Sequence, residues 1–202
     1  MMYQFVDIMM KTASKSVMEQ RVAAAVICKK VLKNIKFNQP TLLGSDHAEY
    51  NAISSFKPNL KIGKLYNNKI DIAVIRINKK GELCNARPCM NCLYIMKSNG
   101  FRYVYYSINN NTIIREKILY MLSIQTSHAV RLNMNIKYDN IMEYYEKLLF
   151  KNFPKEIKLE NLNHFINYNL INILPNAIIN ISKTRVTIHN NEKILVSSRI
   201  FE

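Results

Sequence analysis

Four residues in two short stretches of the chain have the types and spacing that could hold a catalytic metal. HAEYNAI places His47 two residues before Glu49, and PCMNC places Cys89 three residues before Cys92. Residues three apart share one side of a helix, so two thiolates at a helix start can converge on one point. The free N–H groups and positive dipole end of a helix start also stabilise thiolates. The pattern predicts a metal site with an acid/base group beside it.

Zinc is the metal that this set of ligands indicates. His47, Cys89 and Cys92 would supply three ligands and leave one tetrahedral position open, which distinguishes a catalytic zinc from a structural one. Such a zinc lowers the pKa of a water molecule from ~15.7 to ~7. Glu49 would move protons between that water and the substrate, a task for a carboxylate near the metal and not bound to it. The alternative is a closed structural site with Cys84 as fourth ligand, which leaves Glu49 unexplained.

The two stretches together resemble a known signature. H-x-E followed by P-C-x-x-C is the pattern of the zinc-dependent cytidine and deoxycytidylate deaminase superfamily, and here it is written His47-Ala48-Glu49 and Pro88-Cys89-Met90-Asn91-Cys92. The resemblance covers roughly residues 1 to 130. It implies Zn²⁺ on the histidine and both cysteines, with Glu49 as proton shuttle. The implied reaction is hydrolytic deamination of a cytosine base to uracil with release of ammonia.

The resemblance also suggests three substrate-binding positions. Asn38, in KFNQP, lies where members often carry an asparagine that holds the nucleoside, although the usual Gly-Tyr-Asn context is missing. The main chain around Ala48 would bind the base edge. Arg87, just before the Pro-Cys pair, could meet a phosphate, although no general family rule places it there.

Two features of the resemblance point to different branches of the superfamily. The stretch YYSINNNTII predicts an antiparallel final strand pair, which is similar to cytidine or blasticidin deaminases. The HAE form is commoner among deoxycytidylate and tRNA adenosine deaminases. The substrate that we expect first is a free cytosine nucleoside or nucleotide of the cytidine or deoxycytidylate type.

Net charge keeps alternative functions open. The chain carries 29 Lys and Arg against 14 Asp and Glu, a formal charge of +15. Such a surplus favours polyanionic partners, so one alternative is a deaminase acting on a base in single-stranded nucleic acid or tRNA. Another is a catalytically idle zinc and nucleic-acid-binding module, against which the intact Glu49 argues. Compositional bias also explains part of the charge, because Lys, Asn and Ile are all abundant and the cations are spread along the chain.

Hydrophobic periodicity predicts the elements that must position the site. The expected order begins with a helix over 3–18, a strand over 21–32 continued by 34–37 as a hairpin partner, and a loop over 38–46. A helix from His47 to about Phe56, capped by Ser45 or Asp46, and a strand over 69–78 follow. A helix from Pro88 closed by Gly100 and strands over 101–108 and 112–118 complete the order. This order predicts an α/β fold: a cytidine deaminase-like α/β/α sandwich with a mixed central sheet.

Residues 133–202 are expected to form a C-terminal α+β extension of unknown role, after a zinc-binding domain over 1–132. The start of the chain lacks a basic region typical of signal peptides, and no apolar run approaches the ~18 residues of a spanning helix. We therefore expect a cytoplasmic protein with no membrane contact. Dimers or tetramers are common in the superfamily, so a homo-oligomer is a further expectation.

Overall fold

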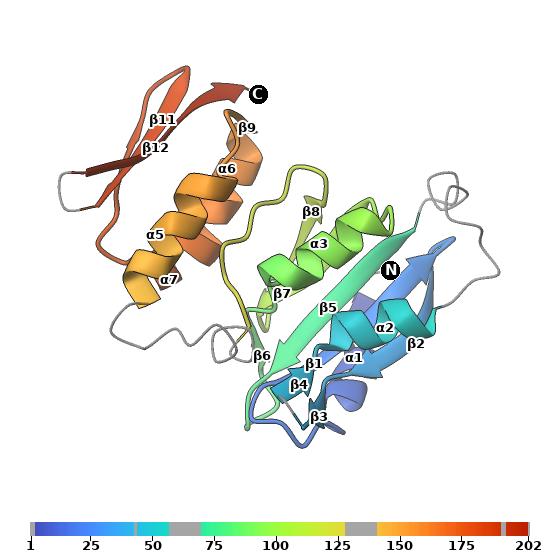
Figure 1. Cartoon of the computed structure of the whole chain (residues 1–202). Coiled ribbons are helices and arrows are strands. Elements are labelled where there is room, and N and C mark those ends of the chain that lie inside the picture. Colours follow the sequence, from blue (N-terminus) through green and yellow to red (C-terminus); the bar gives the residue numbers. More distant parts are fainter. Residues whose placement is uncertain (1–2, 43, 57–69, 128–140, 191–192, 202) are drawn as a thin grey trace. The chain divides into compact units, whose positions relative to one another are not determined.

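The computed structural model describes residues 3–42, 44–56, 70–127, 141–190 and 193–201 (Figure 1). The chain divides into two compact units, Met1–Leu119 and Tyr120–Glu202. The domain boundary expected after residue 132 lies outside the described residues. Ile124 belongs to the hydrophobic core of the second unit.

A mixed six-stranded sheet forms the centre of the first unit. Its strands are β1 (Arg21–Cys28), β2 (Val31–Phe37), β5 (Asp71–Ile77), β6 (Leu83–Cys84), β7 (Tyr103–Asn109) and β8 (Thr112–Lys117), in the order β2-β1-β5-β7-β8 with β6 beside β5. The β5–β7 pair is parallel, and the other pairs are antiparallel. The antiparallel final pair is confirmed. The strand predicted over 21–32 is too long, because the chain turns at Lys29 and Lys30 and β2 already begins at Val31. Strand β6 was not predicted.

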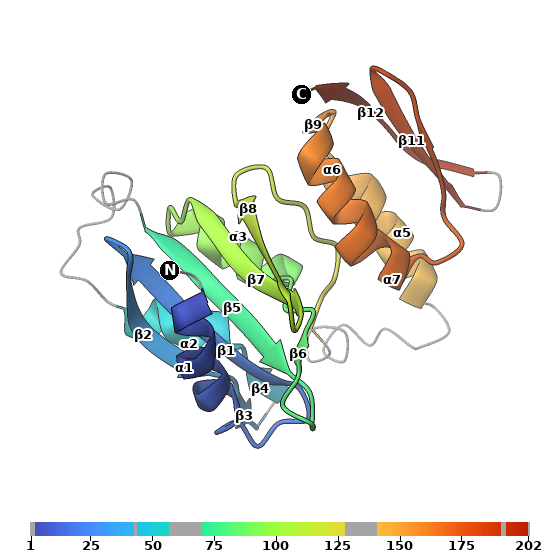
Figure 2. The same cartoon turned by 180° about the vertical axis from the view of Figure 1, so that it is seen from behind.

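Helices cover both faces of this sheet. Helix α1 (Tyr3–Ala13) lies on one face, and α2 (Ala48–Ser55) and α3 (Met90–Ser98) lie on the other, as the two opposite views show (Figures 1 and 2). The predicted α/β/α sandwich is therefore confirmed. Helix α3 ends as expected, because Gly100 follows it with φ 72°, a left-handed conformation that glycine adopts without steric cost.

Small side chains in β1 let the two helical layers approach the sheet closely. Ala23, Ala24 and Ala25 are all fully buried. Ala23 and Ala25 pack in a cluster with Met9 and Ala13 of α1, and Ala24 faces the opposite side because side chains alternate along a strand. Apolar side chains on both faces explain why the sequence of this strand shows no alternation.

The loop predicted over 38–46 is wrong. Its residues form a short hairpin of β3 (Gln39–Thr41) and β4 (Gly44–Asp46). The predicted cap of the next helix is also wrong, because His47 itself is the N-cap residue of α2 and makes no capping side-chain hydrogen bond. Ser45 and Asp46 are held in strand β4 by pairing, so they do not reach the helix start in a capping conformation.

The second unit is a four-stranded sheet with helices, as expected for an α+β extension. Its elements are α5 (Ile141–Asn152), β9 (Glu156–Lys158), α6 (Leu159–Phe165), the π-helix η3 (Ile166–Leu170), α7 (Ile171–Ile173), β10 (Ile178–Ile181), β11 (Arg185–Asn190) and β12 (Lys193–Phe201). The strand order is β10-β11-β12-β9. Strand β9, parallel to β12, was not predicted because three residues carry no detectable alternation.

None of the helices in the described ranges has both the length and the apolar character needed to cross a bilayer.

Overpacking β1 should separate the helices from the sheet. Ala25→Leu adds three carbons at a fully buried position next to α1, and we expect it to lower the free energy of unfolding by about 1–3 kcal/mol. Urea denaturation followed by circular dichroism measures the change. The matched control is Val31→Leu, which adds volume at a side chain that is 50% exposed on β2. Equal stability of the two variants would contradict this packing.

Candidate metal centre

The starts of two helices bring the candidate ligands together. His47 is the N-cap residue of α2, and Cys89 is the N-cap residue of α3, both with extended backbone angles. Cys92 follows in the first turn of α3 and is 2% exposed. Because α2 and α3 contact each other on one face of the sheet, residues 42 positions apart in sequence meet at one point.

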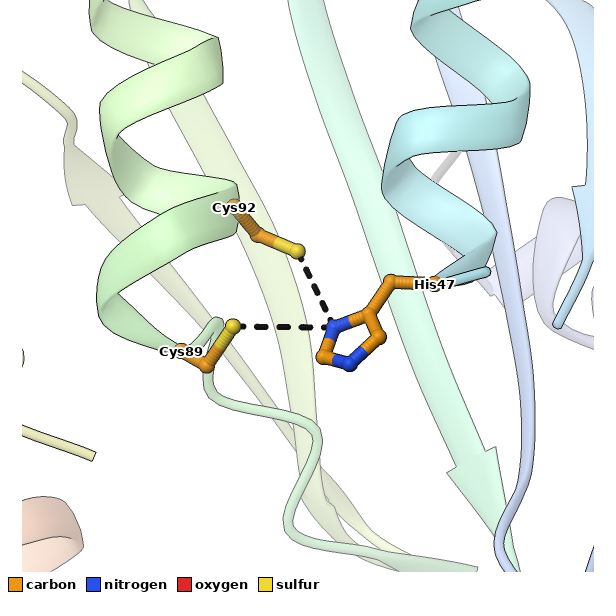
Figure 3. A group of neighbouring side chains, drawn as sticks. All are labelled: His47, Cys89 and Cys92. Atoms are coloured by element: carbon orange, nitrogen blue, oxygen red, sulfur yellow. Dashed lines mark hydrogen bonds between the residues drawn. The ribbon is translucent and has the colours of Figure 1, made fainter. Parts of the chain in front are cut away.

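Figure 3 shows the three side chains pointing toward one another. The Nδ1 atom of His47 lies 3.2 Å from the Sγ atom of Cys92 and 3.5 Å from that of Cys89. One ligand atom from each residue lies within 4.8 Å of the others. A tetrahedral zinc with bonds of ~2.0 Å to nitrogen and ~2.3 Å to sulfur separates those atoms by about 3.5 Å. The two nitrogen–sulfur distances therefore fit a tetrahedral zinc ion.

Proton sharing among the three groups gives the site its charge pattern. A hydrogen bond with Cys89 raises the pKa of His47 from 6.5 to about 9, against the opposing effect of burial. A hydrogen bond from Cys92 lowers the pKa of the Cys89 thiol, and the same bond raises the pKa of Cys92. Without a metal, these hydrogen bonds therefore favour the thiolate form of Cys89 and the protonated forms of His47 and Cys92. A divalent cation would displace those protons, since metal ligands must be deprotonated.

Glu49 lies in the first turn of α2 and is 5% exposed. Burial raises the pKa of its carboxyl group above 4.5, while the charge of His47 and a hydrogen bond with Cys92 oppose that rise. A buried carboxyl group next to candidate metal ligands, with a raised pKa, has the properties of a general acid/base. The structure therefore brings Glu49 to the three residues with which the sequence associated it.

Cys84 is not part of this cluster. It lies on β6, where its Sγ atom is 3.6 Å from the main-chain oxygen of Glu82. Among the residues that the structure describes, only His47, Cys89 and Cys92 form a group that could hold a metal. The alternative of a closed four-ligand site that includes Cys84 is not supported.

Asn38 is buried between the ends of β1 and β2. Its Oδ1 atom accepts a hydrogen bond from the main chain of Val22 at 2.9 Å, and its Nδ2 atom donates to the main-chain oxygen of Gln20 at 2.7 Å. Both ends of the amide are thereby used to tie the strands together. The nucleoside contact of Asn38 stays a prediction, as does the contact of the base with the main chain around Ala48.

Arg87 lies inside a buried network of charged and polar groups. Its guanidinium forms an ion pair with Glu116 of β8, and both side chains are almost completely buried. It also donates to the hydroxyl group of Tyr106 at 2.6 Å, and that hydroxyl donates to Glu116 at 3.0 Å. These contacts give Arg87 a structural role beneath the cysteine segment. Its contact with a phosphate stays a prediction, which none of the recorded contacts supports.

Sequence reasoning missed Glu116 and Tyr106 as partners of Arg87. Tyr106 and Glu116 lie on adjacent strands β7 and β8, and alternation along those strands places both on the face that carries α3. The one available signal was a glutamate inside an otherwise apolar and basic strand, TIIREKI, which calls for a buried cation.

Comparison with solved structures finds cytidine deaminases among the structural neighbours of the chain. No family model matches the chain, and no curated protein matches its sequence. A cytidine deaminase from Burkholderia pseudomallei is 15% identical with a TM-score of 0.45, over 58% of this chain and 93% of its own. A mutant cytidine deaminase from Mycobacterium tuberculosis is 13% identical with a TM-score of 0.38, over 55% of this chain and 84% of its own. Both neighbours are described as cytidine deaminases.

Replacing Glu49 should stabilise the metal-free protein in a pH-dependent way. Because the carboxyl group has a higher pKa in the folded than in the unfolded state, the folded protein is destabilised where Glu49 is ionised. Glu49→Gln should therefore raise the free energy of unfolding at about pH 8. The gain should shrink toward zero as the pH falls below 4.5, where both states are protonated. Urea denaturation with a chelator present measures the gain, and a gain independent of pH would contradict the burial of an ionisable group.

Removing one member of the buried ion pair should be costly. Glu116→Gln leaves the Arg87 guanidinium without its buried counter-charge, and we expect a loss of about 3–5 kcal/mol in the free energy of unfolding. The matched control is the double variant Arg87→Met with Glu116→Leu, which removes both charges and should lose less than the single variant. A double variant that is less stable than Glu116→Gln would show that packing, not charge, dominates at this position.

Proposed function

We propose that this protein is a zinc-dependent hydrolase that deaminates the cytosine base of a free nucleoside or nucleotide to uracil, with release of ammonia. The observation that carries the proposal is the convergence of His47, Cys89 and Cys92 with the buried carboxyl group of Glu49 beside them. A histidine and two thiolates leave a tetrahedral metal one open position, and a carboxyl group outside the ligand set is available for proton transfer.

Zinc is the cofactor that we propose, because one nitrogen and two sulfur ligands at these distances suit it. A bound zinc would supply a Lewis acid that activates water near neutral pH. The chain supplies the rest. The N–H groups at the starts of α2 and α3 favour anionic thiolates, and the burial of Cys89 and Cys92 limits their exposure to water.

Glu49 would move the protons of the reaction. Hydrolysis of the C4–N bond requires that a water molecule lose a proton, that N3 of the ring gain one, and that the amine leave protonated. A carboxyl group whose pKa lies above the usual range alternates between acid and base more readily near neutral pH than an exposed glutamate. The position of Glu49, two residues after His47 on the same helix start, supports this role.

The strand arrangement supports cytosine as the base. Strands β7 and β8 form an antiparallel hairpin, which the resemblance described above associates with cytidine or blasticidin deaminases. Adenine in tRNA is the weaker candidate on this ground. A cytoplasmic location and a homo-oligomeric state remain predictions from the sequence.

Product analysis by mass spectrometry tests the reaction. Zinc-loaded protein is offered cytidine, deoxycytidine and both monophosphates, and we expect uracil products from at least one of them. Glu49→Gln should reduce the rate by roughly 10²–10⁴-fold. Glu19→Gln, at an exposed carboxyl group, is the matched control and should leave the rate unchanged. Equal rates in the two variants would remove Glu49 from the reaction.

Metal analysis tests the ligand set independently of activity. We expect about one zinc ion per chain. The ion should be lost in Cys92→Ala and retained in Cys84→Ala, because Cys92 belongs to the cluster and Cys84 does not. Zinc should also raise the melting temperature of the wild-type protein, since binding to the folded state alone is stabilising. Retention of zinc by Cys92→Ala would overturn the proposed site.

A further inference from the structure

The β1–β2 hairpin concentrates positive charge that deamination of a free nucleoside does not use. Lys29 and Lys30 form its two-residue turn, and Lys33 and Lys36 lie on β2, which is the end strand in the sheet order. All four side chains are exposed. The sequence from residue 20 to residue 45 contains no Asp or Glu, so the hairpin itself carries charge of one sign.

The turn holds its two lysines in an unfavourable backbone conformation. Lys29 has φ 49° and Lys30 has φ 67°, with Cys28 paired to Val31 across the turn. A two-residue hairpin turn with both φ values positive prefers Asn-Gly, because side chains with a Cβ atom crowd the left-handed region. Lysine at both positions therefore opposes local stability. Strain kept at an exposed site points to a use for the side chains themselves.

The lysines of β2 lie on the face of the sheet that carries the candidate active site. Lys33 pairs with Val26 and Lys36 pairs with Ala24 across the strands, and directly paired residues share a face. Their neighbours Ala23, Ala25 and Ile27 pack on the opposite face with α1. Lys33 and Lys36 therefore lie on the face of the sheet opposite to α1. Helix α2, which begins after His47, covers that face (Figure 1).

Helix α2 is fastened to this strand at the end where β2 finishes. The Nδ2 atom of Asn51 donates to the main-chain oxygen of Phe37 at 3.2 Å. The row of lysines therefore runs from the hairpin turn along β2 toward the strand end on which the first turns of α2 are anchored.

Counter-charges and edge protection do not account for this row. Within the described ranges the structure records ion pairs for Arg87, Arg102, Lys147 and Arg199, and none for the four hairpin lysines. Lysine on an end strand also prevents edge-to-edge aggregation, which explains Lys33 and Lys36. It does not explain Lys29 and Lys30, because turn residues present no strand edge.

We propose that the β1–β2 hairpin binds the phosphate backbone of a single-stranded polynucleotide. From Lys30 to Lys36 the chain extends about 20 Å at the rise of a strand, so the four ammonium groups cannot converge on one phosphate. They match a linear polyanion instead. That the bound strand supplies the base to Glu49 rests on the proposed function, and it would extend the substrate class from free nucleotides to cytosine within a strand.

Salt-dependent binding of a fluorescent single strand tests the proposal. The full chain carrying Glu49→Gln, which prevents turnover, is titrated with a cytosine-containing oligonucleotide at several salt concentrations, and anisotropy reports binding. Affinity should fall steeply with salt, and each lysine removed should reduce the slope of log K against log salt by about 0.7. Absence of binding at low salt would overturn the proposal.

The turn variant separates binding from folding. Lys29→Asn with Lys30→Gly removes two charges and installs the residues that the turn prefers, so the melting temperature should rise while affinity falls roughly tenfold at moderate salt. Lys33→Ala with Lys36→Ala should weaken binding similarly. The matched control, Lys151→Ala with Lys155→Ala, removes two exposed lysines of the second unit and should leave affinity unchanged.

Two further results would overturn the proposal. The first is an equal loss of affinity in all three double variants, which would show attraction by net charge alone. The second is displacement of the strand by polyglutamate as effectively as by unlabelled oligonucleotide, which would indicate an acidic protein partner. Failure of the proposed function is seen separately. If wild-type protein deaminates neither free nucleosides nor the strand, while the hairpin variants alone lose binding, the polynucleotide site stands without the reaction.

Discussion

The contact between the starts of α2 and α3 is the constraint on which the rest of the first unit depends. It places a histidine, two cysteines and a glutamate in a space largely closed to water. Burial of ionisable groups is unfavourable unless they share protons or bind a cation. In the metal-free protein the Cys89 thiolate is stabilised by His47 and Cys92, and Glu49 is left with a raised pKa. A divalent cation bound here would offset the negative charge of these buried groups.

The sheet on which α2 and α3 pack fixes the positions of the two helix starts. Three alanines in β1 leave room for helices on both faces, and the buried pair of Arg87 with Glu116 connects the residues before Cys89 to strand β8. Arg87 lies two residues before Cys89, a candidate metal ligand, so a shift of this ion pair would displace the start of α3. A buried ion pair contributes little net stability but penalises its own disruption strongly. It is thus better suited to fixing the position of the cysteine segment than to stabilising the fold.

Local patterns in the sequence were sufficient for the motif and for most elements, because hydrophobic periodicity and short-range spacing determine them. The helix after His47 and the helix after Pro88 were predictable in this way. The roles of Arg87 and Asn38 were not, since an arginine beside a cysteine motif gives no sign that Glu116 and Tyr106 will surround it. The β3–β4 hairpin and strand β9 were missed because three-residue strands depend on tertiary pairing, which leaves no periodic signal.

The arrangement of the positive charges is also a feature that the sequence alone does not reveal. In sequence, the cations are spread along the chain, and compositional bias is a sufficient explanation of their number. In the structure, four of them line one hairpin, and two of those have positive φ values. A biased composition explains why lysine is frequent, but it does not remove the steric cost of lysine in a left-handed turn. Asparagine, which is also abundant in this sequence, fits such a turn better. Lysine at both turn positions therefore indicates that the charge itself is used. A linear row of positive charge on the face that carries a candidate base-binding site suits a nucleic acid strand.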